Sequence, residues 1–262
     1  TSSPVPMHSR LAIVPLVLAL FTSSAAAQET ETERAAARDV VARMDSLERS
    51  LDVPALVARV TKPNAARDRV VERAKALMTT DLLPLADDIT RHPEIGFQET
   101  RSVARLTAYL EAHHFTVQMG VAGLATAFVA RYDGNRGAPN LGVIVEYDAL
   151  RGTKGAFHGD QHSAQGPVGI AAAVAIAEWL RQSGAPGSVT VFGTPGEEMM
   201  PPAAKTVMFD AGVFRGMDIL VRSHSSPRTS RPAPRFGTCC MNINGVKYTF
   251  TGAPAHELTA WN

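Results

Sequence analysis

Strand-length apolar runs alternate with helical stretches through the middle of this chain, and this alternation restricts the fold more than any other feature. The runs at 141–147, 188–193 and 217–223 are largely apolar, which is typical of strands buried on both faces of a sheet. Strands separated by helices form parallel sheets that helices cover on both faces. The expected strands are 115–119, 124–132, 141–147, 188–193 and 217–223, and the expected helices are 99–113, 163–181 and 203–211. The sequence therefore predicts an α/β fold with a mostly parallel sheet and helices on both faces.

Two helical stretches add detail to this prediction. Residues 169–180 (GIAAAVAIAEWL) are apolar almost all round, so this helix must be buried between the sheet and its neighbours. Residues 67–90 carry an apolar stripe at helical spacing, but Pro84 lies within the stripe. Since proline removes a helical hydrogen bond and clashes with the preceding turn, we expect this helix to be kinked or divided there.

Acidic and histidine residues follow three of the predicted strands. Asp160 and His162 come after the first run and a loop, Glu197 and Glu198 follow the second, and His224 follows the third. Ligands in open α/β sheets bind outside the carboxyl ends of the strands, so these side chains can converge on one site. Imidazoles and carboxylates are the ligands of a zinc-type ion. The sequence predicts a metal site at this edge of the sheet.

A hydrolytic site with two metal ions needs a bridging carboxylate, flanking ligands and one base that is free of metal. Asp160 and His162 are two residues apart just before a helix, where a turn can aim both side chains at one point. The tandem Glu197-Glu198 can supply one ligand and one general base. Each feature also has an ordinary explanation: the histidines of 158–162 can lie in a surface loop, Glu197-Glu198 can be an exposed acidic pair, and His224 can be a polar cap of a strand. Because all of them follow predicted strands, we favour a metal site.

The amino terminus has the features of a secretory signal. A basic start at Met7 precedes a short apolar run at 11–21, and small residues Ala25 and Ala27 follow it. The run is too short to span a bilayer and Pro15 interrupts it, which argues against an uncleaved anchor. We expect residues 1–27 to be removed after Ala27, with six residues preceding the initiator, and the protein to be exported to the periplasm or secreted.

Charge and composition divide the rest of the chain. Lys and Arg number 26 against 25 Asp and Glu, so no net field favours nucleic acid or a membrane surface. Residues 28–64 are charged and alanine-rich and predict a helical leader, and 65–235 contain the predicted α/β domain. After a Pro/Ser/Arg connector, 236–262 alternate in polarity, and we expect them to begin a second, incomplete domain.

Several motifs in this order resemble the aminoacylase and zinc carboxypeptidase family of metal-dependent amidohydrolases. That family includes hippurate hydrolase, indole-acetyl-amino-acid hydrolase and p-aminobenzoyl-glutamate hydrolase, and the run at 146–150 is most similar to the last of these. The motifs are 92–99 (HPEIGFQE), 146–150 (EYDAL), 158–162 (HGDQH), 194–198 (TPGEE), 223–224 (SH) and 252–256 (GAPAH).

The resemblance implies specific roles and partners. Asp160, His162, Glu198 and His224 would hold two divalent ions, expected to be zinc, with manganese or cobalt as alternatives, and Glu197 would be the general base. His256 would lie in a lid and dimerisation domain that begins at 236–262, and would reach the site of a partner subunit in a homodimer to stabilise the oxyanion. The substrate would be an N-acyl amino acid, an aminobenzoyl-glutamate-like compound or a dipeptide.

The sequence departs from the family pattern in two ways. Amidohydrolases usually have cysteine at the position of Asp160, whereas the carboxypeptidase branch has a bridging aspartate there, so the preference can move toward harder ions. The family also takes a last histidine ligand from a carboxyl-terminal half beyond Asn262. Two other interpretations therefore stay open: an exported binding module without a complete metal site, and a serine hydrolase, although no G-x-S-x-G elbow surrounds Ser163.

Overall fold

The computed structural model describes residues 31–200, 202–225, 249 and 251. Within this part of the chain, α2 (Glu31–Ser50) and α3 (Val53–Thr61) belong to one compact unit and residues 63–225 to another. The signal predicted at 1–27 lies outside the described residues, as do His256 and nearly all of the second domain predicted at 236–262. The predicted domain boundaries stay predictions.

The predicted α/β fold is confirmed in the unit that begins at residue 63. Its five-stranded sheet has the order β1-β2-β6-β3-β7. The central and carboxyl-terminal strands β6, β3 and β7 run parallel, whereas β1 and β2 form an antiparallel edge. The strands are β1 (Thr116–Met119), β2 (Phe128–Tyr132), β3 (Asn135–Val145), β6 (Pro186–Gly193) and β7 (Ile219–Val221).

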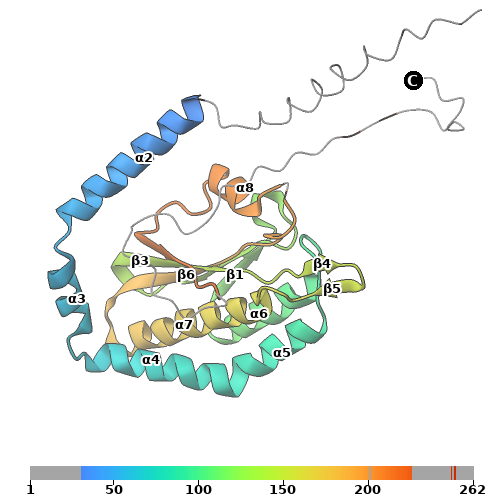
Figure 1. The fold of residues 1–262 in the computed structure, drawn as a ribbon. Helices are drawn as coiled ribbons and strands as arrows, with labels where there is room; N and C mark the ends of the chain where they lie inside the picture. Colours follow the sequence, from blue (N-terminus) through green and yellow to red (C-terminus); the bar gives the residue numbers. More distant parts are fainter. Residues whose placement is uncertain (1–30, 201, 226–248, 250, 252–262) are drawn as a thin grey trace, which may run out of the picture. The chain divides into compact units, whose positions relative to one another are not determined.

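Helices cover both faces of this sheet (Figure 1). Side chains of a strand alternate between faces, so Val143 and Val191 pack in the core beneath α7 (His162–Ser183), whereas Phe192 packs in a second cluster with Met208. Met208 belongs to α8 (Ala204–Asp210), on the opposite face from α7. Helix α6 (Thr100–Ala112) lies on the α7 side. The apolar helix predicted at 169–180 is the buried middle of α7, as its composition requires.

The helix predicted at 67–90 is divided, but one turn before its proline. α4 (Ala65–Leu77) runs into a π-helical turn (Met78–Leu82), and α5 (Leu83–Arg91) follows. Pro84 lies in the first turn of α5, where a missing N–H costs no helical hydrogen bond. The proline therefore starts the second helix instead of breaking a single one.

The leader predicted at 28–64 is helical where it is described. Asp52 caps α3 by accepting a 3.0 Å hydrogen bond from the Ala55 N–H. No residue of α3 is buried. Among the residues that the structure describes, no helix combines the length and apolar character needed to cross a bilayer.

A short hairpin links the end of β3 to the start of α7. It pairs β4 (Leu150–Gly152) with β5 (Gly155–Phe157), an element that the sequence analysis did not predict. The hairpin carries the chain outward and returns it to the carboxyl edge of the sheet, directly before 158–162. The ends of β3, β6 and β7 meet at this edge.

Candidate metal centre

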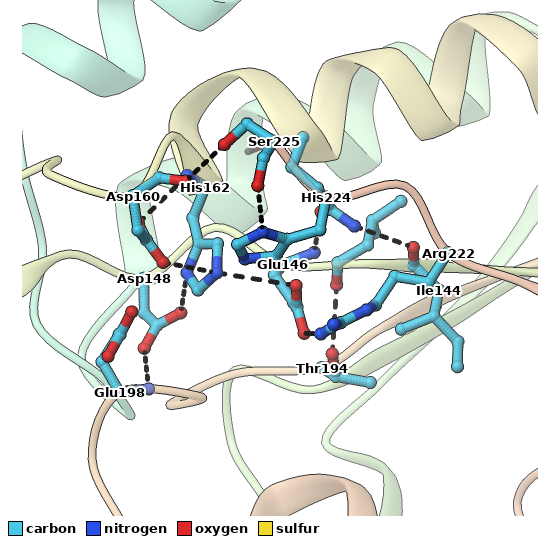
Figure 2. A network of polar contacts seen from close by, with 12 residues as sticks. Ile144, Glu146, Asp148, Asp160, His162, Thr194, Glu198, Arg222, His224 and Ser225 are labelled. Atoms are coloured by element: carbon cyan, nitrogen blue, oxygen red, sulfur yellow. Dashed lines mark hydrogen bonds and ion pairs between the residues drawn. The ribbon is translucent and has the colours of Figure 1, made fainter. Parts of the chain in front are cut away.

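His162 is the centre of a buried polar cluster at the carboxyl edge of the sheet (Figure 2). It is the first residue of α7 and is fully buried. Its Nδ1 lies 2.8 Å from Oδ1 of Asp148. A carboxylate only accepts, so Nδ1 carries a proton, and in the neutral ring the Nε2 lone pair faces the cluster. Metal-binding histidines are oriented in this way by a carboxylate behind the ring.

Asp160 faces the free nitrogen of this ring. Its Oδ2 lies 2.8 Å from His162 Nε2, yet neither atom has a hydrogen-bond partner and both are buried. Two lone pairs held this close in a buried place repel each other unless a cation or a proton lies between them. Burial lowers the pKa of His162, but the hydrogen bond to Asp148 and the surrounding carboxylates outweigh it, so that pKa is raised.

The loop after β6 brings Glu197 and Glu198 to the same place. Oxygens of both, together with atoms of Asp160 and His162, all lie within 4.8 Å of one another. The Glu198 N–H donates to Oδ2 of Asp148 over 2.9 Å, so Asp148 orients both the imidazole and this loop. The predicted residues Asp160, His162, Glu197 and Glu198 are therefore brought together, whereas their roles as ligands or base stay predictions.

The carboxyl groups of Glu198 and Asp160 shift each other's pKa in opposite directions. The hydrogen bond between the two carboxyls, followed by burial and the charge of Asp160, raises the pKa of Glu198 to about 8. Burial raises the pKa of Asp160, but the hydrogen bond from Glu198 and the charge of His162 leave it lowered. Two carboxylates this close cannot both ionise cheaply without a cation.

His224 enters a second, overlapping group. Its ring packs edge-on against that of His162, with centroids 5.6 Å apart, and its Nδ1 lies 2.9 Å from the Ser225 carbonyl oxygen. The ring therefore donates from Nδ1 and keeps the Nε2 lone pair free. Atoms of Glu146, His162 and His224 also lie within 4.8 Å of one another. His224 thus joins the other predicted ligands through His162.

Glu146 and Asp148 are site residues to which the sequence analysis assigned no role. Both follow β3 and are fully buried. Burial raises the pKa of Glu146, but the charges and hydrogen bonds of Lys205 and Arg222 outweigh it and hold that pKa below its ordinary value. Buried acidic residues directly after an apolar strand were the available signal, since such carboxylates need a partner.

Two further residues that the sequence analysis missed hold the backbone of the site. Glu99 is buried and accepts hydrogen bonds from Gly196 N–H and the Thr126 hydroxyl, each 2.7 Å long, and burial raises its pKa. Gln165 accepts from Glu146 N–H over 2.6 Å and donates to the Ser223 carbonyl over 3.0 Å, which ties the end of β3 to the end of β7. Nothing in the sequence marks either residue as a long-range tether.

The donor set fits divalent metal ions. Carboxylate oxygens and neutral imidazole nitrogens are the ligands that zinc and manganese accept, and the lone pairs of the cluster converge without donors between them. His158 also has buried ring nitrogens without partners among the described residues. Among the described residues, the buried side-chain atoms without a hydrogen-bond partner are Asp88 Oδ2 on α5 and, near this edge of the sheet, Glu146 Oε2, Asp160 Oδ2, His162 Nε2 and both nitrogens of His158.

Comparisons with known proteins agree with this geometry. The chain is 34% identical over 186 residues to a p-aminobenzoyl-glutamate hydrolase polypeptide of Escherichia coli K12, and the match covers 66% of this chain and 37% of that protein. It is 29% identical over 179 residues to the Xaa-Arg dipeptidase of Mus musculus, covering 64% of this chain and 39% of the dipeptidase. It is 27% identical over 157 residues to the N-acetylcysteine deacetylase of Bacillus subtilis, covering 56% of this chain and 40% of the deacetylase. The chain thus spans about two fifths of the length of these relatives.

One solved structure supports the fold. A crystal structure described as an aminohydrolase of methicillin-resistant Staphylococcus aureus matches 58% of this chain and 41% of its own, with a TM-score of 0.52 at 21% identity. No family model matches the chain. The motifs, the clustered donors and the similarity to these hydrolases lead to one conclusion. The chain belongs to the aminoacylase and zinc carboxypeptidase family of metal-dependent amidohydrolases.

Proposed function

We propose that this protein is a metal-dependent hydrolase that cleaves the amide bond of N-acyl amino acids, aminobenzoyl-glutamate-like compounds or dipeptides. One observation carries the proposal: Asp160, His162, Glu197 and Glu198 converge within 4.8 Å, and Asp160 Oδ2 and His162 Nε2 are buried 2.8 Å apart without a hydrogen-bond partner. A purely structural cluster would satisfy these atoms internally.

Asp160, His162, Glu198 and His224 would hold two divalent ions, zinc in the first instance, with manganese or cobalt as alternatives. Such ions polarise a carbonyl group and lower the pKa of a water molecule to about 7. Asp148 orients the imidazole of His162 and anchors the backbone of Glu198. The protein's own contribution is therefore to fix the direction of each donor before ions and substrate arrive.

Glu197 would serve as the general base. It is half-buried beside Glu198, and the N–H of the preceding Gly196 is tied to Glu99. Its carboxylate would accept a proton from the attacking water and pass it to the leaving amine. General acid–base catalysis of this kind contributes about 10²- to 10⁴-fold.

The names of the relatives support the substrate class. p-Aminobenzoyl-glutamate, an Xaa-Arg dipeptide and N-acetylcysteine each join an acyl group to the nitrogen of an amino acid. The cleaved bond is then an amide whose leaving group is an amino acid. We propose that the present protein cleaves the same kind of bond, and the proposal does not specify the side chain of the amino acid that is released.

The proposal also covers cellular location and assembly. Residues 7–27 support export to the periplasm or secretion, because a basic start precedes a short apolar run and small residues. A homodimer in which His256 reaches the partner's site would supply the oxyanion donor. N-terminal sequencing of the exported protein tests the proposed export, since the mature chain is expected to begin at Gln28.

The variant Glu197→Gln tests the catalytic role. We expect kcat on p-aminobenzoyl-glutamate or N-acetyl amino acids to fall by about 10²- to 10⁴-fold, because the amide cannot accept the proton. Bound zinc, measured by elemental analysis, should stay near the wild-type amount. Glu111→Gln is the matched control, since Glu111 is exposed on α6 away from the cluster. Near-wild-type turnover in Glu197→Gln would contradict the proposal.

A further inference from the structure

Glu146 is held by two cations through a single oxygen. Its Oε1 accepts from Nη1 of Arg222 at 2.7 Å and also pairs with Nζ of Lys205. Lys205 is at the start of α8 and Arg222 directly follows β7, so two separate elements supply the cations that pair with this one oxygen. These contacts fix the rotamer of Glu146 and point its second oxygen away from both cations.

The second oxygen faces the metal cluster and has no partner. Glu146 is fully buried, and Oε2 accepts no hydrogen bond among the described residues although it lies only 3.5 Å from His162 Nε2. Leaving a buried acceptor without a donor costs the desolvation free energy of that group, and the cost is larger for a charged group. Figure 2 shows Glu146 directed toward the rings of His162 and His224.

When both imidazole rings are neutral, the neighbours of this oxygen are acceptors that offer it no hydrogen bond. His224 donates from Nδ1 to the Ser225 carbonyl, and His162 donates from Nδ1 to Asp148. Each ring then presents a lone pair on Nε2. Ligand atoms of Glu146, His162 and His224 lie within 4.8 Å of one another, which places three acceptors around one point.

We propose that Glu146 is itself a metal ligand, binding through Oε2 the ion that His224 also holds. This inference rests on the proposed function and deepens it. His162 has one lone pair in its neutral ring and can bind one ion only, so among the described residues the ion of His224 needs a donor other than His162. Glu146 supplies it, and Lys205 and Arg222 orient the carboxylate as hydrogen-bonding neighbours orient other metal ligands.

The alternative is that Glu146 only anchors Lys205 and Arg222. Two variants separate the alternatives. Glu146→Gln keeps the size of the side chain and an oxygen for the cations but removes the charged ligand. The double variant Lys205→Met with Arg222→Met keeps the carboxylate and removes both cations.

The test is zinc binding by the purified protein, measured by elemental analysis after dialysis and by titration calorimetry. The wild-type protein should bind two zinc ions. In Glu146→Gln one ion should be lost on dialysis while the other is unchanged, whereas the double variant should keep both ions, with one bound about 10- to 100-fold more weakly because the groups that orient Glu146 are gone. Cobalt substitution gives a second readout, because the magnetic coupling of two neighbouring ions should be lost in Glu146→Gln alone.

Each outcome has one meaning. Wild-type protein that binds no zinc would contradict the proposed function itself. Two ions bound with unchanged affinity in Glu146→Gln would overturn only the role of Glu146. Equal loss of one ion in both variants would also overturn it, since Glu146 would then act through the cations. Should Glu146→Gln fail to fold in circular dichroism, Glu146→Asp decides, because it keeps the charge but shortens the side chain. Weaker binding of one ion than in the double variant supports the ligand role, and binding equal to that of the double variant refutes it.

Discussion

At the scale of residues, the site is an excess of buried acceptors gathered around one imidazole. The sequence predicted Asp160, His162, Glu197, Glu198 and His224 as site residues, because their shared position after apolar strands is not explained by the ordinary use of each residue alone. Which of them touch depends on rotamers and loops that the sequence does not encode locally. The carboxylates of Glu146 and Asp148 escaped notice because their partners come from α7, α8 and β7, far along the chain.

The raised pKa of Glu198 predicts that metal binding depends on pH. Because the pKa of Glu198 is raised to about 8, ions that need its carboxylate must displace a proton below that pH. Zinc affinity should rise as pH increases from about 6 to about 8 and level off above, with a proton released per protein. Calorimetry in buffers of different ionisation enthalpy measures the release.

The metal-free protein should show the opposite trend. A folded-state pKa above the unfolded value means that the folded state binds the proton more tightly. The stabilising contribution of Glu198 is therefore complete below its ordinary pKa and is lost as pH rises toward about 8. Glu198→Gln removes the titrating group and serves as the control. A metal-free stability that does not decline over this range in the wild-type protein would contradict the assignment.

At the scale of elements, periodicity predicted most of the unit that begins at residue 63. The long buried strands β3 and β6 and the helix α7 were predicted because apolar runs of their length have few alternatives. The hairpin β4-β5 was missed because three-residue strands carry too short a pattern. The antiparallel pairing of β1 and β2 could not be predicted, because the direction of a strand in a sheet is set by tertiary structure and does not change the periodicity of the sequence.

Close packing of α7 on the end of β3 gives an element-scale prediction. A Cβ on Gly166 would lie 2.9 Å from the Glu146 carbonyl oxygen, so Gly166→Ala must push the start of α7 away from β3. Overpacking of about 1–3 kcal/mol should outweigh the gain of about 1 kcal/mol in helix propensity. Urea unfolding should show lower stability, and zinc affinity should fall because His162 begins this helix.

Val168→Ala is the matched control for this substitution. Val168 is in the same turn of α7 but is 41% exposed, so its truncation leaves the contact with β3 intact. Its zinc affinity should equal that of the wild-type protein. If Gly166→Ala were as stable as the wild type and bound zinc equally well, α7 would not depend on this contact.

At the scale of the whole unit from residue 63 onward, the metal centre joins segments that are distant in sequence. The residues after β3, the start of α7, the loop after β6 and the end of β7 each contribute one or two donors. In the absence of metal these carboxylates repel one another, so the same residues that bind ions lower the stability of the metal-free state. Bound ions should therefore raise the stability of the folded protein in addition to their proposed role in hydrolysis.

Thermal unfolding measures this coupling. A ligand that binds only the folded state at about 100 times its Kd adds about 2.7 kcal/mol, which for a domain of this size raises Tm by about 5–10 °C. We expect zinc to raise the Tm of the EDTA-treated protein by this amount, and EDTA to reverse it. Because Asp160→Asn combined with His162→Asn removes the central donors, that variant should show no zinc-dependent shift. An equal shift in both proteins would mean that zinc binds elsewhere, and the cluster at the carboxyl edge of the sheet would lose its assignment as the metal centre.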